Sequence, residues 1–135
     1  MDADKISVVQ ECVTNSLAGK LTFPEVVHKL TAIGVERYHA DYTRRESTYY
    51  LSDGQSHVLP LPHPEQLIAA TFDASGVEAA IRASQRGEIS YVEFLKWTMA
   101  AGCVGYFVQI TGRRALYFGR NGDVHLEPFP VASKP

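Results

Sequence analysis

Residues 34–54 read GVERYHADYTRRESTYYLSDG, and residues 102–122 read GCVGYFVQITGRRALYFGRNG. The second stretch lies 68 positions after the first, and the two align without a gap. Each begins at a glycine, continues with alternating residues rich in tyrosine or phenylalanine, and ends at an Asp-Gly or Asn-Gly pair. Alternation predicts strands, and these dipeptides are typical of hairpin turns. Each stretch therefore predicts a three-stranded antiparallel meander when extended to residue 59 or 129.

The similarity extends to the segments before the strands. Between residues 21–57 and 89–125, nine of 37 aligned positions are identical, whereas unrelated sequences of average composition would share about two. The identical pairs are Glu25/Glu93, Ala32/Ala100, Gly34/Gly102, Tyr38/Tyr106, Thr43/Thr111, Arg45/Arg113, Tyr49/Tyr117, Gly54/Gly122 and His57/His125. We interpret this as an internal duplication within a single domain, residues 1–135. The first repeat covers about 4–59, a proline-rich linker 60–64, and the second repeat about 72–129.

Helical patterns precede each meander. Apolar spacing predicts helices over residues 5–17 and 76–85, and capping signals at Thr22/Glu25 and Ser90/Glu93 begin two more. The fold class is therefore α+β, two repeats of helix, helix and meander with the helices packed on one sheet face. The pattern leaves open whether the six strands form one sheet or two. The last five residues are expected to fray, and Trp97 and Met99 are expected in the core.

Composition excludes several classes of function. The chain has 135 residues, 45% hydrophobic and 21% charged, with a net charge of −2. Such a balance does not favour nucleic acid or an anionic membrane as a partner. Cys12 and Cys103 have no metal-ligand spacing and read as buried free thiols, and no leader or membrane segment is evident. We expect a cytoplasmic protein that uses no cofactor.

The predicted strand register assembles one polar cluster. With two-residue turns, Tyr50 lies opposite both His39 and His57, and alternation adds Asp41 and Thr48 to the same face. Two histidines, a carboxylate and a phenol could perform acid/base chemistry, and His39, Asp41 and His57 are weak candidates for a metal site. The opposite face suits helix packing, with Tyr38, Ala40, Tyr42, Tyr49, Leu51 and Val58.

The second repeat weakens the catalytic interpretation. Its equivalents of His39, Asp41, Thr48, Tyr50 and His57 are Phe107, Gln109, Leu116, Phe118 and His125. Either a single working site remains in the first repeat, or the histidines merely end strands beside aromatic rings.

Arginines at equivalent turns form a different candidate site. Arg45 and Arg113 occupy matching turns, and Arg120 follows a later strand. Guanidinium groups suit carboxylate and phosphate, so these three could hold an anionic ligand between the repeats, with His125 as a further ligand-binding candidate. Exposed turn charges are the alternative.

Several stretches resemble a known bacterial family. They are residues 38–42 (YHADY), 48–50 (TYY), 87–91 (GEISY), 101–103 (AGC), 105–106 (GY), 112–113 (GR) and 122–125 (GDVH). This pattern is similar to the YdfO-like family of unknown function, whose members often carry the label "phage envelope protein". The resemblance implies an α+β fold and a bacterial or prophage source. It implies no activity and no catalytic residues.

Three functions remain open from the sequence. The first is a non-enzymatic binding or regulatory module, expected to be a homodimer, that holds a small polar or anionic ligand. The second is an enzyme or metal protein using His39, Asp41, His57 and Tyr50. The third is a structural or protein-interaction protein with Phe107 and Phe118 at a dimer contact.

Overall fold

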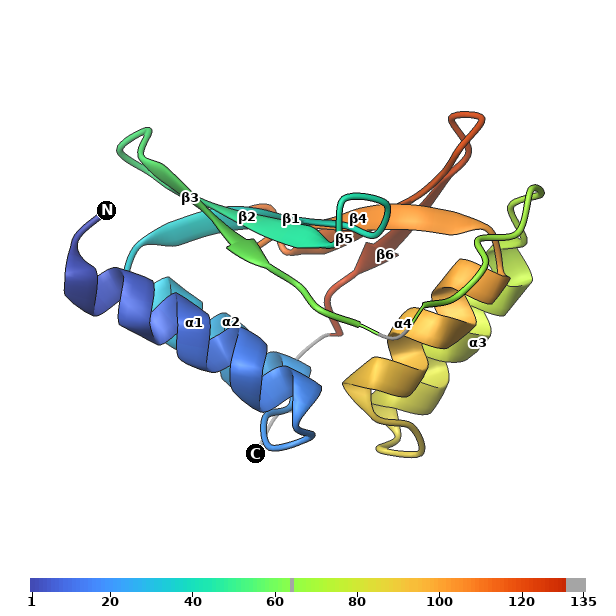
Figure 1. Cartoon of the computed structure of the whole chain (residues 1–135), viewed down its shortest axis with the longest axis horizontal. Helices are drawn as coiled ribbons and strands as arrows, with labels where there is room; N and C mark the ends of the chain where they lie inside the picture. Colours follow the sequence, from blue (N-terminus) through green and yellow to red (C-terminus); the bar gives the residue numbers. More distant parts are fainter. Residues whose placement is uncertain (64, 131–135) are drawn as a thin grey trace.

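A computed structural model describes residues 1–63 and 65–130. In these residues, four helices and six strands follow one another in two similar series (Figure 1). The first series is α1 (Ala3–Leu17), α2 (Phe23–Ala32), β1 (Val35–Asp41), β2 (Glu46–Leu51) and β3 (Ser56–Pro60). The second series is α3 (Ala74–Gln85), α4 (Tyr91–Ala100), β4 (Cys103–Gln109), β5 (Arg114–Gly119) and β6 (Val124–Pro128).

All six strands form one open antiparallel sheet, in the order β3-β2-β1-β4-β5-β6. β1 and β4 pair at the centre and join the two series. Both helix pairs lie on the same side of the sheet, which we call the inner face; the other side is the outer face (Figure 1). The predicted α+β class, with helices on one sheet face, is confirmed, and the open question of one sheet or two is answered.

Local sequence signals fix the helix ends. Thr22 and Glu25 form the predicted capping box of α2, and Ser90 and Glu93 form that of α4. These reciprocal contacts satisfy backbone amides that have no partner within the helix. Because the same capping contacts form at both sites, α2 and α4 begin at equivalent positions of the two series.

The core lies between the helices and the inner face and is rich in tyrosine. Tyr38, Tyr42, Tyr49, Tyr106 and Tyr117 are all buried. Met99 is also buried as predicted, but the prediction for Trp97 is wrong, because its side chain is 45% exposed. The difference follows from α4 being covered by the sheet on one side only.

The hairpin loops differ from the predicted two-residue turns. Leu51 donates its amide to Gln55, which leaves a three-residue loop in which Gly54 has a φ of 95°. The same arrangement recurs between β5 and β6, where Gly122 has a φ of 91°. A change of one residue in a loop reverses which face the following strand presents. The predicted register of β3 is therefore wrong, and Val58 points outward, 49% exposed.

The first turn of each meander is also longer than predicted. Four residues separate β1 from β2, and Asp41 pairs with Glu46. Arg45 closes this turn with a φ of 56°, and its equivalent Arg113 has the same value. The predicted pairing of Tyr50 with His39 is replaced by a pairing of Tyr50 with Arg37. Because this shift is two residues, the faces of β1 and β2 stay as predicted.

The segment between the two series crosses the inner side of the molecule (Figure 1). Leu61 is buried, and the amides of Ala69 and Asp73 donate to the carbonyls of Met99 and Ala101. Pro60, predicted in the linker, is the last residue of the edge strand β3, where a missing amide is tolerated. Pro64 of the predicted linker and the last five residues, predicted to fray, lie outside the described residues.

Candidate functional site

The outer face carries four of the five residues of the predicted polar cluster. Alternation along β1 and β2 places His39, Asp41, Thr48 and Tyr50 there. The His39 ring stacks on Phe107 of β4, with ring centroids 4.5 Å apart. The guanidinium carbon of Arg37 lies 4.2 Å from the centre of the Tyr50 ring. His39 and Tyr50 thus share a face but pack against different partners.

The fifth residue, His57, lies on the inner face. It pairs with Tyr49, whereas His39 pairs with Thr48. Thr48 and Tyr49 are successive residues of β2, so their side chains point to opposite sides of the sheet. His39 and His57 therefore cannot bind one metal ion or act as a pair on one substrate. The structure does not form the two-histidine site expected from the sequence.

Asp41 has a local structural role. Its carboxylate accepts hydrogen bonds from the amides of Thr43 and Arg44, both at 3.1 Å, and so closes the turn after β1. Burial lowers the pKa of His39, and the nearby charge of Asp41 opposes this shift without cancelling it. His39 is consequently an uncharged, stacked ring at neutral pH.

The second half of the outer face is apolar. Phe107, Leu116 and Phe118 lie at its centre, and the Phe107 and Phe118 rings meet edge to face with centroids 6.1 Å apart. Val124 and Leu126 on β6 are 51% and 45% exposed. We call the outward residues of β4, β5 and β6 the apolar half. Both helix pairs lie on the opposite side of the sheet from the apolar half (Figure 1).

The outer face carries few charged residues, and its positive charges come from arginine. Its cations are Arg37 and Arg114, and its anions are Asp41 and Glu46. None of the lysines within residues 1–63 and 65–130 lies on a strand. Lysine on exposed strands is a common device against sheet association, and it is depleted from protein interfaces. The outer face lacks that device.

The three candidate arginines do not converge on one ligand. Arg45 and Arg113 lie at opposite ends of the sheet, because β1 and β4 are antiparallel neighbours and each arginine follows the end of its strand. Arg45 donates to the carbonyl of His63, and Arg120 donates to that of Ile68 at 2.8 Å. Both arginines therefore hold the segment that connects β3 to α3.

Arg113 has a separate packing role. Its guanidinium carbon lies 5.4 Å from the centre of the Phe129 ring. The clamp on an anion predicted for Arg45, Arg113 and Arg120 is not formed, because each side chain is engaged by its own part of the fold.

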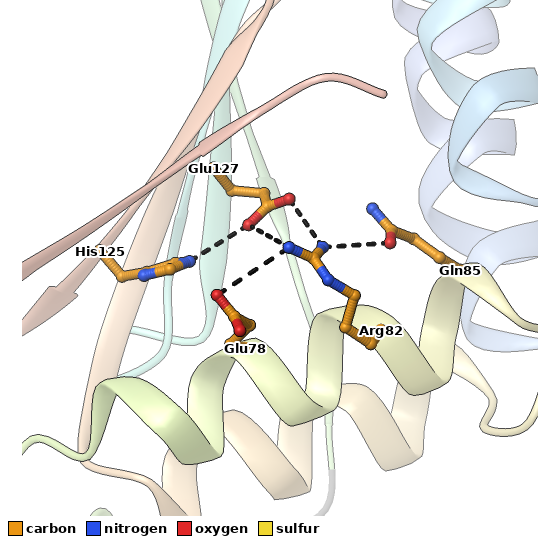
Figure 2. A network of polar contacts seen from close by, with 5 residues as sticks. All are labelled: Glu78, Arg82, Gln85, His125 and Glu127. Atoms are coloured by element: carbon orange, nitrogen blue, oxygen red, sulfur yellow. Dashed lines mark hydrogen bonds and ion pairs between the residues drawn. The ribbon is translucent and has the colours of Figure 1, made fainter. Parts of the chain in front are cut away.

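His125 belongs to a polar cluster between β6 and α3 (Figure 2). Its Nε2 lies 3.2 Å from a carboxylate oxygen of Glu127. Arg82 of α3 donates to both oxygens of Glu127, at 2.8 and 3.4 Å, and lies 3.9 Å from Glu78. Arg82 also donates to Gln85 at 3.1 Å. One guanidinium thus bridges two carboxylates that come from a helix and an edge strand.

The electrostatics of this cluster favour ionised carboxylates. Burial would raise the pKa of Glu127, but hydrogen bonds from Arg82 and His125 and the charge of Arg82 outweigh it and lower the pKa. The hydrogen bond with Glu127 in turn raises the pKa of Arg82. The side chains of His125 and Glu127 are only 17% and 13% exposed. Glu127 is therefore a largely buried anion whose cationic partner is Arg82.

The first repeat has the same scaffold without the charges. Subtracting 68 from Glu78, Arg82, His125 and Glu127 gives Gln10, Thr14, His57 and Leu59. There, the side-chain amide of Gln10 donates to the Thr14 hydroxyl at 3.2 Å. The carboxylates are thus specific to the second repeat.

A shallow hollow of about 430 Å³ lies beside α3 and α4. Gly76, Ala79, Ala100 and Ala101 are among its lining residues, and the half-exposed ring of Trp97 is another. Asp73, Lys96 and Gln66 add polar groups. The hollow combines an indole with one anion and one cation.

Residues 20–127 match the model of a family described as "Protein of unknown function (DUF1398)". This match begins after α1 in the first repeat and extends to β6 in the second. The chain belongs to the DUF1398 family. The family description names no function, so the chemistry of this chain has to be inferred from its own residues.

Bacterial relatives of this DUF1398 protein are found in mycobacteria. A segment of 58 residues is 33% identical to an uncharacterized protein of Mycobacterium bovis and to uncharacterized proteins of Mycobacterium tuberculosis strains CDC 1551 and H37Rv. The segment is 43% of this chain and 35% of each relative, so the match spans about a third of the relatives' length. None of the helices within the described residues has the length and apolar character needed to span a bilayer.

Sequence reasoning missed Glu78, Arg82 and Glu127 of this DUF1398 chain. The signal was present in the repeat alignment, which replaces Gln10, Thr14 and Leu59 by charged residues. It could not be interpreted without the register of β6, because only alternation from His125 places Glu127 on the inner face beside α3.

Proposed function

We propose that this chain is a non-enzymatic protein-interaction module that forms a homodimer through the outer face of its sheet. The observation that carries the proposal is the apolar half, where Phe107, Leu116 and Phe118 are partly exposed and Val124 and Leu126 are exposed on three adjacent strands. Contiguous exposed apolar surface on a folded domain marks interaction sites. The separation of His39 from His57 supports a non-enzymatic role over a catalytic one.

A second copy of the chain is the partner that this surface fits best. Within the described strands β4, β5 and β6, Arg114 is the only formal charge among the outward residues. A surface with almost no charge pairs with itself without burying unpaired ions. A twofold axis lying between the two sheets and perpendicular to the strands would set the apolar half of one chain on that of the other.

The size of the face is consistent with a dimer that uses all of it. Six strands about 4.8 Å apart, each about 17 Å long, form a flat area of roughly 500 Å², and side chains enlarge the accessible area. A stable interface needs about 800 Å² on each partner. The apolar half alone is too small, so the outward residues of β1–β3 would form the polar rim. Two of them, Tyr50 and Arg37, are of residue types that are enriched at interfaces.

The test uses the repeat as its own control. Leu116→Glu places a charge at the centre of the apolar half, and Thr48→Glu places the same charge at the equivalent position of the first repeat. Light scattering with size exclusion should show twice the chain mass of 14.9 kDa for the wild type and for Thr48→Glu. Leu116→Glu should show the monomer mass with an unchanged circular dichroism spectrum. A monomeric wild type at high micromolar concentration, or equal effects of the two substitutions, contradicts the proposal.

The hollow beside Trp97 favours a second candidate function, binding of a small polar ligand. Asp73 and Lys96 could pair with a zwitterion while its apolar part covers the indole. Thermal-shift measurements with amino acids and other small metabolites should show a rise in melting temperature that Trp97→Ala abolishes. The absence of any response from the wild type contradicts this candidate.

We also propose a cellular location and a source for the protein. The cysteines of the described residues, Cys12 and Cys103, are both buried free thiols. Free thiols are the usual state in a reducing compartment, which supports a cytoplasmic location. The YdfO-like resemblance and the mycobacterial relatives support a bacterial or prophage source.

A further inference from the structure

We propose that Glu78, His125 and Glu127 form a binding site for a divalent transition metal, with zinc as the ion that fits best. One ligand atom from each of the three residues lies within 4.8 Å of the other two. The residues come from α3 and β6, and Figure 2 shows their side chains directed toward one another. This inference is independent of the proposed dimer, because the site lies on the inner side of the sheet.

The donor set matches the coordination chemistry of zinc. Zinc binds histidine nitrogen and carboxylate oxygen at about 2.0–2.2 Å, which places neighbouring ligand atoms about 3.3–3.6 Å apart. The present spacing of up to 4.8 Å needs a closure of about 1 Å. Glu78 can supply it, because its side chain is 53% exposed on α3 while His125 and Glu127 are held on β6. Three protein ligands leave a fourth position for water.

Arg82 is the cationic side chain that contacts both carboxylates of this site. Its guanidinium bridges Glu127 and Glu78, so a metal ion must displace it. The Arg82 side chain is 42% exposed and already donates to Gln85, so it can turn toward solvent and keep a partner. A partly exposed ion pair contributes little to stability, whereas a divalent ion would contact all three ligands at once. Arg82 and the metal are therefore competitors for the same carboxylates.

The first repeat provides a natural comparison. His57 occupies the place of His125 on β3, but Gln10 and Leu59 replace the two carboxylates. A lone histidine without carboxylates is not a zinc site. The proposal thus predicts one metal ion per chain, bound in the second repeat. Bound metal would tie the edge strand β6 to α3.

The test is a zinc titration by calorimetry of the full chain and three variants. We expect one zinc ion per chain for the wild type and for His57→Ala. His125→Ala should weaken binding by about tenfold or more, since it removes a direct ligand. Arg82→Met should tighten binding by about tenfold, because it removes the competing cation and keeps a similar side-chain length. Cobalt(II) should produce a visible absorption band that zinc abolishes.

The effect of Arg82→Met separates a metal site from a purely structural ion-pair network. In a structural network, this variant would be less stable and would bind no zinc. Absence of saturable zinc binding by both the wild type and Arg82→Met overturns the proposal. Binding that survives His125→Ala unchanged, or that is lost equally in His57→Ala, also overturns it, since the ion would then be held elsewhere. Circular dichroism of each variant confirms that it is folded.

Discussion

His39 and Phe107 are equivalent positions of the two repeats, and they lie opposite each other where β1 and β4 pair. An offset of 68 relates the repeats, and the registered pairs of β1 and β4 sum to 146, so position 39 alone faces its own equivalent. An approximate twofold axis therefore passes through the sheet between these two stacked rings. The axis explains the symmetric strand order β3-β2-β1-β4-β5-β6.

Equivalent glycines on the two sides of this axis should respond differently to substitution. Gly34 and Gly102 end α2 and α4 with φ values of 85° and 86°, so alanine at either position costs about 1–2 kcal/mol of backbone strain. A Cβ at Gly102 would also lie 2.3 Å from the carbonyl oxygen of Thr71, whereas a Cβ at Gly34 meets nothing within 4 Å. Urea unfolding should show Gly102→Ala to be clearly the more destabilising. Equal losses would show that the backbone at Thr71 moves aside freely.

The repeat pattern made most of the fold predictable from the sequence. Capping boxes, glycine stops and alternation located the elements, because each is a local property of a few neighbouring residues. The candidate site was harder to predict from the sequence. The loop ending at Gly54 contains one residue more than predicted, and this alone moved His57 to the inner face. Contacts such as Arg120 with Ile68, or Arg82 with Glu127, join residues far apart in the chain and leave no local pattern.

The buried hydrogen bond between Tyr42 and Thr98 should be asymmetric in mutational cost. Their oxygens are 2.9 Å apart, and the Thr98 hydroxyl also contacts the carbonyls of Phe94 and Leu95, at 2.9 and 3.1 Å. Tyr42→Phe leaves Thr98 with those carbonyls and should cost about 1 kcal/mol. Thr98→Val leaves the Tyr42 hydroxyl without that oxygen partner and should cost about 1–3 kcal/mol.

Denaturant titration of both single variants and the double variant measures this asymmetry. The double variant should lose less than the sum of the two single losses, because no hydroxyl is then left behind. A larger loss for Tyr42→Phe than for Thr98→Val, or additive losses, would contradict this pattern of hydrogen bonds around the Thr98 hydroxyl.

The stacked ring of His39 should make the protein less stable in mild acid. Burial lowers the pKa of His39 in the folded state, and Asp41 opposes this only in part. Between the folded and unfolded pKa values, the unfolded chain binds more protons, so the free energy of unfolding rises with pH. This contribution is complete above the unfolded pKa of about 6.5 and declines as the pH falls below it. A homodimer that covers the outer face would strengthen the effect, because it removes more water from the ring.

His39→Phe tests this expectation by placing at position 39 the residue of its equivalent, Phe107. The variant keeps an aromatic ring at the approximate twofold axis and removes the titrating group. Urea unfolding at pH 7.5 and pH 5.5 should show a smaller loss of stability on acidification for His39→Phe than for the wild type, because the two proteins differ only at position 39. If the proposed homodimer forms, sedimentation at the same two pH values should show the same difference in its dissociation. An identical pH response of the two proteins would mean that His39 stays hydrated and contributes nothing to the acid sensitivity of the outer face.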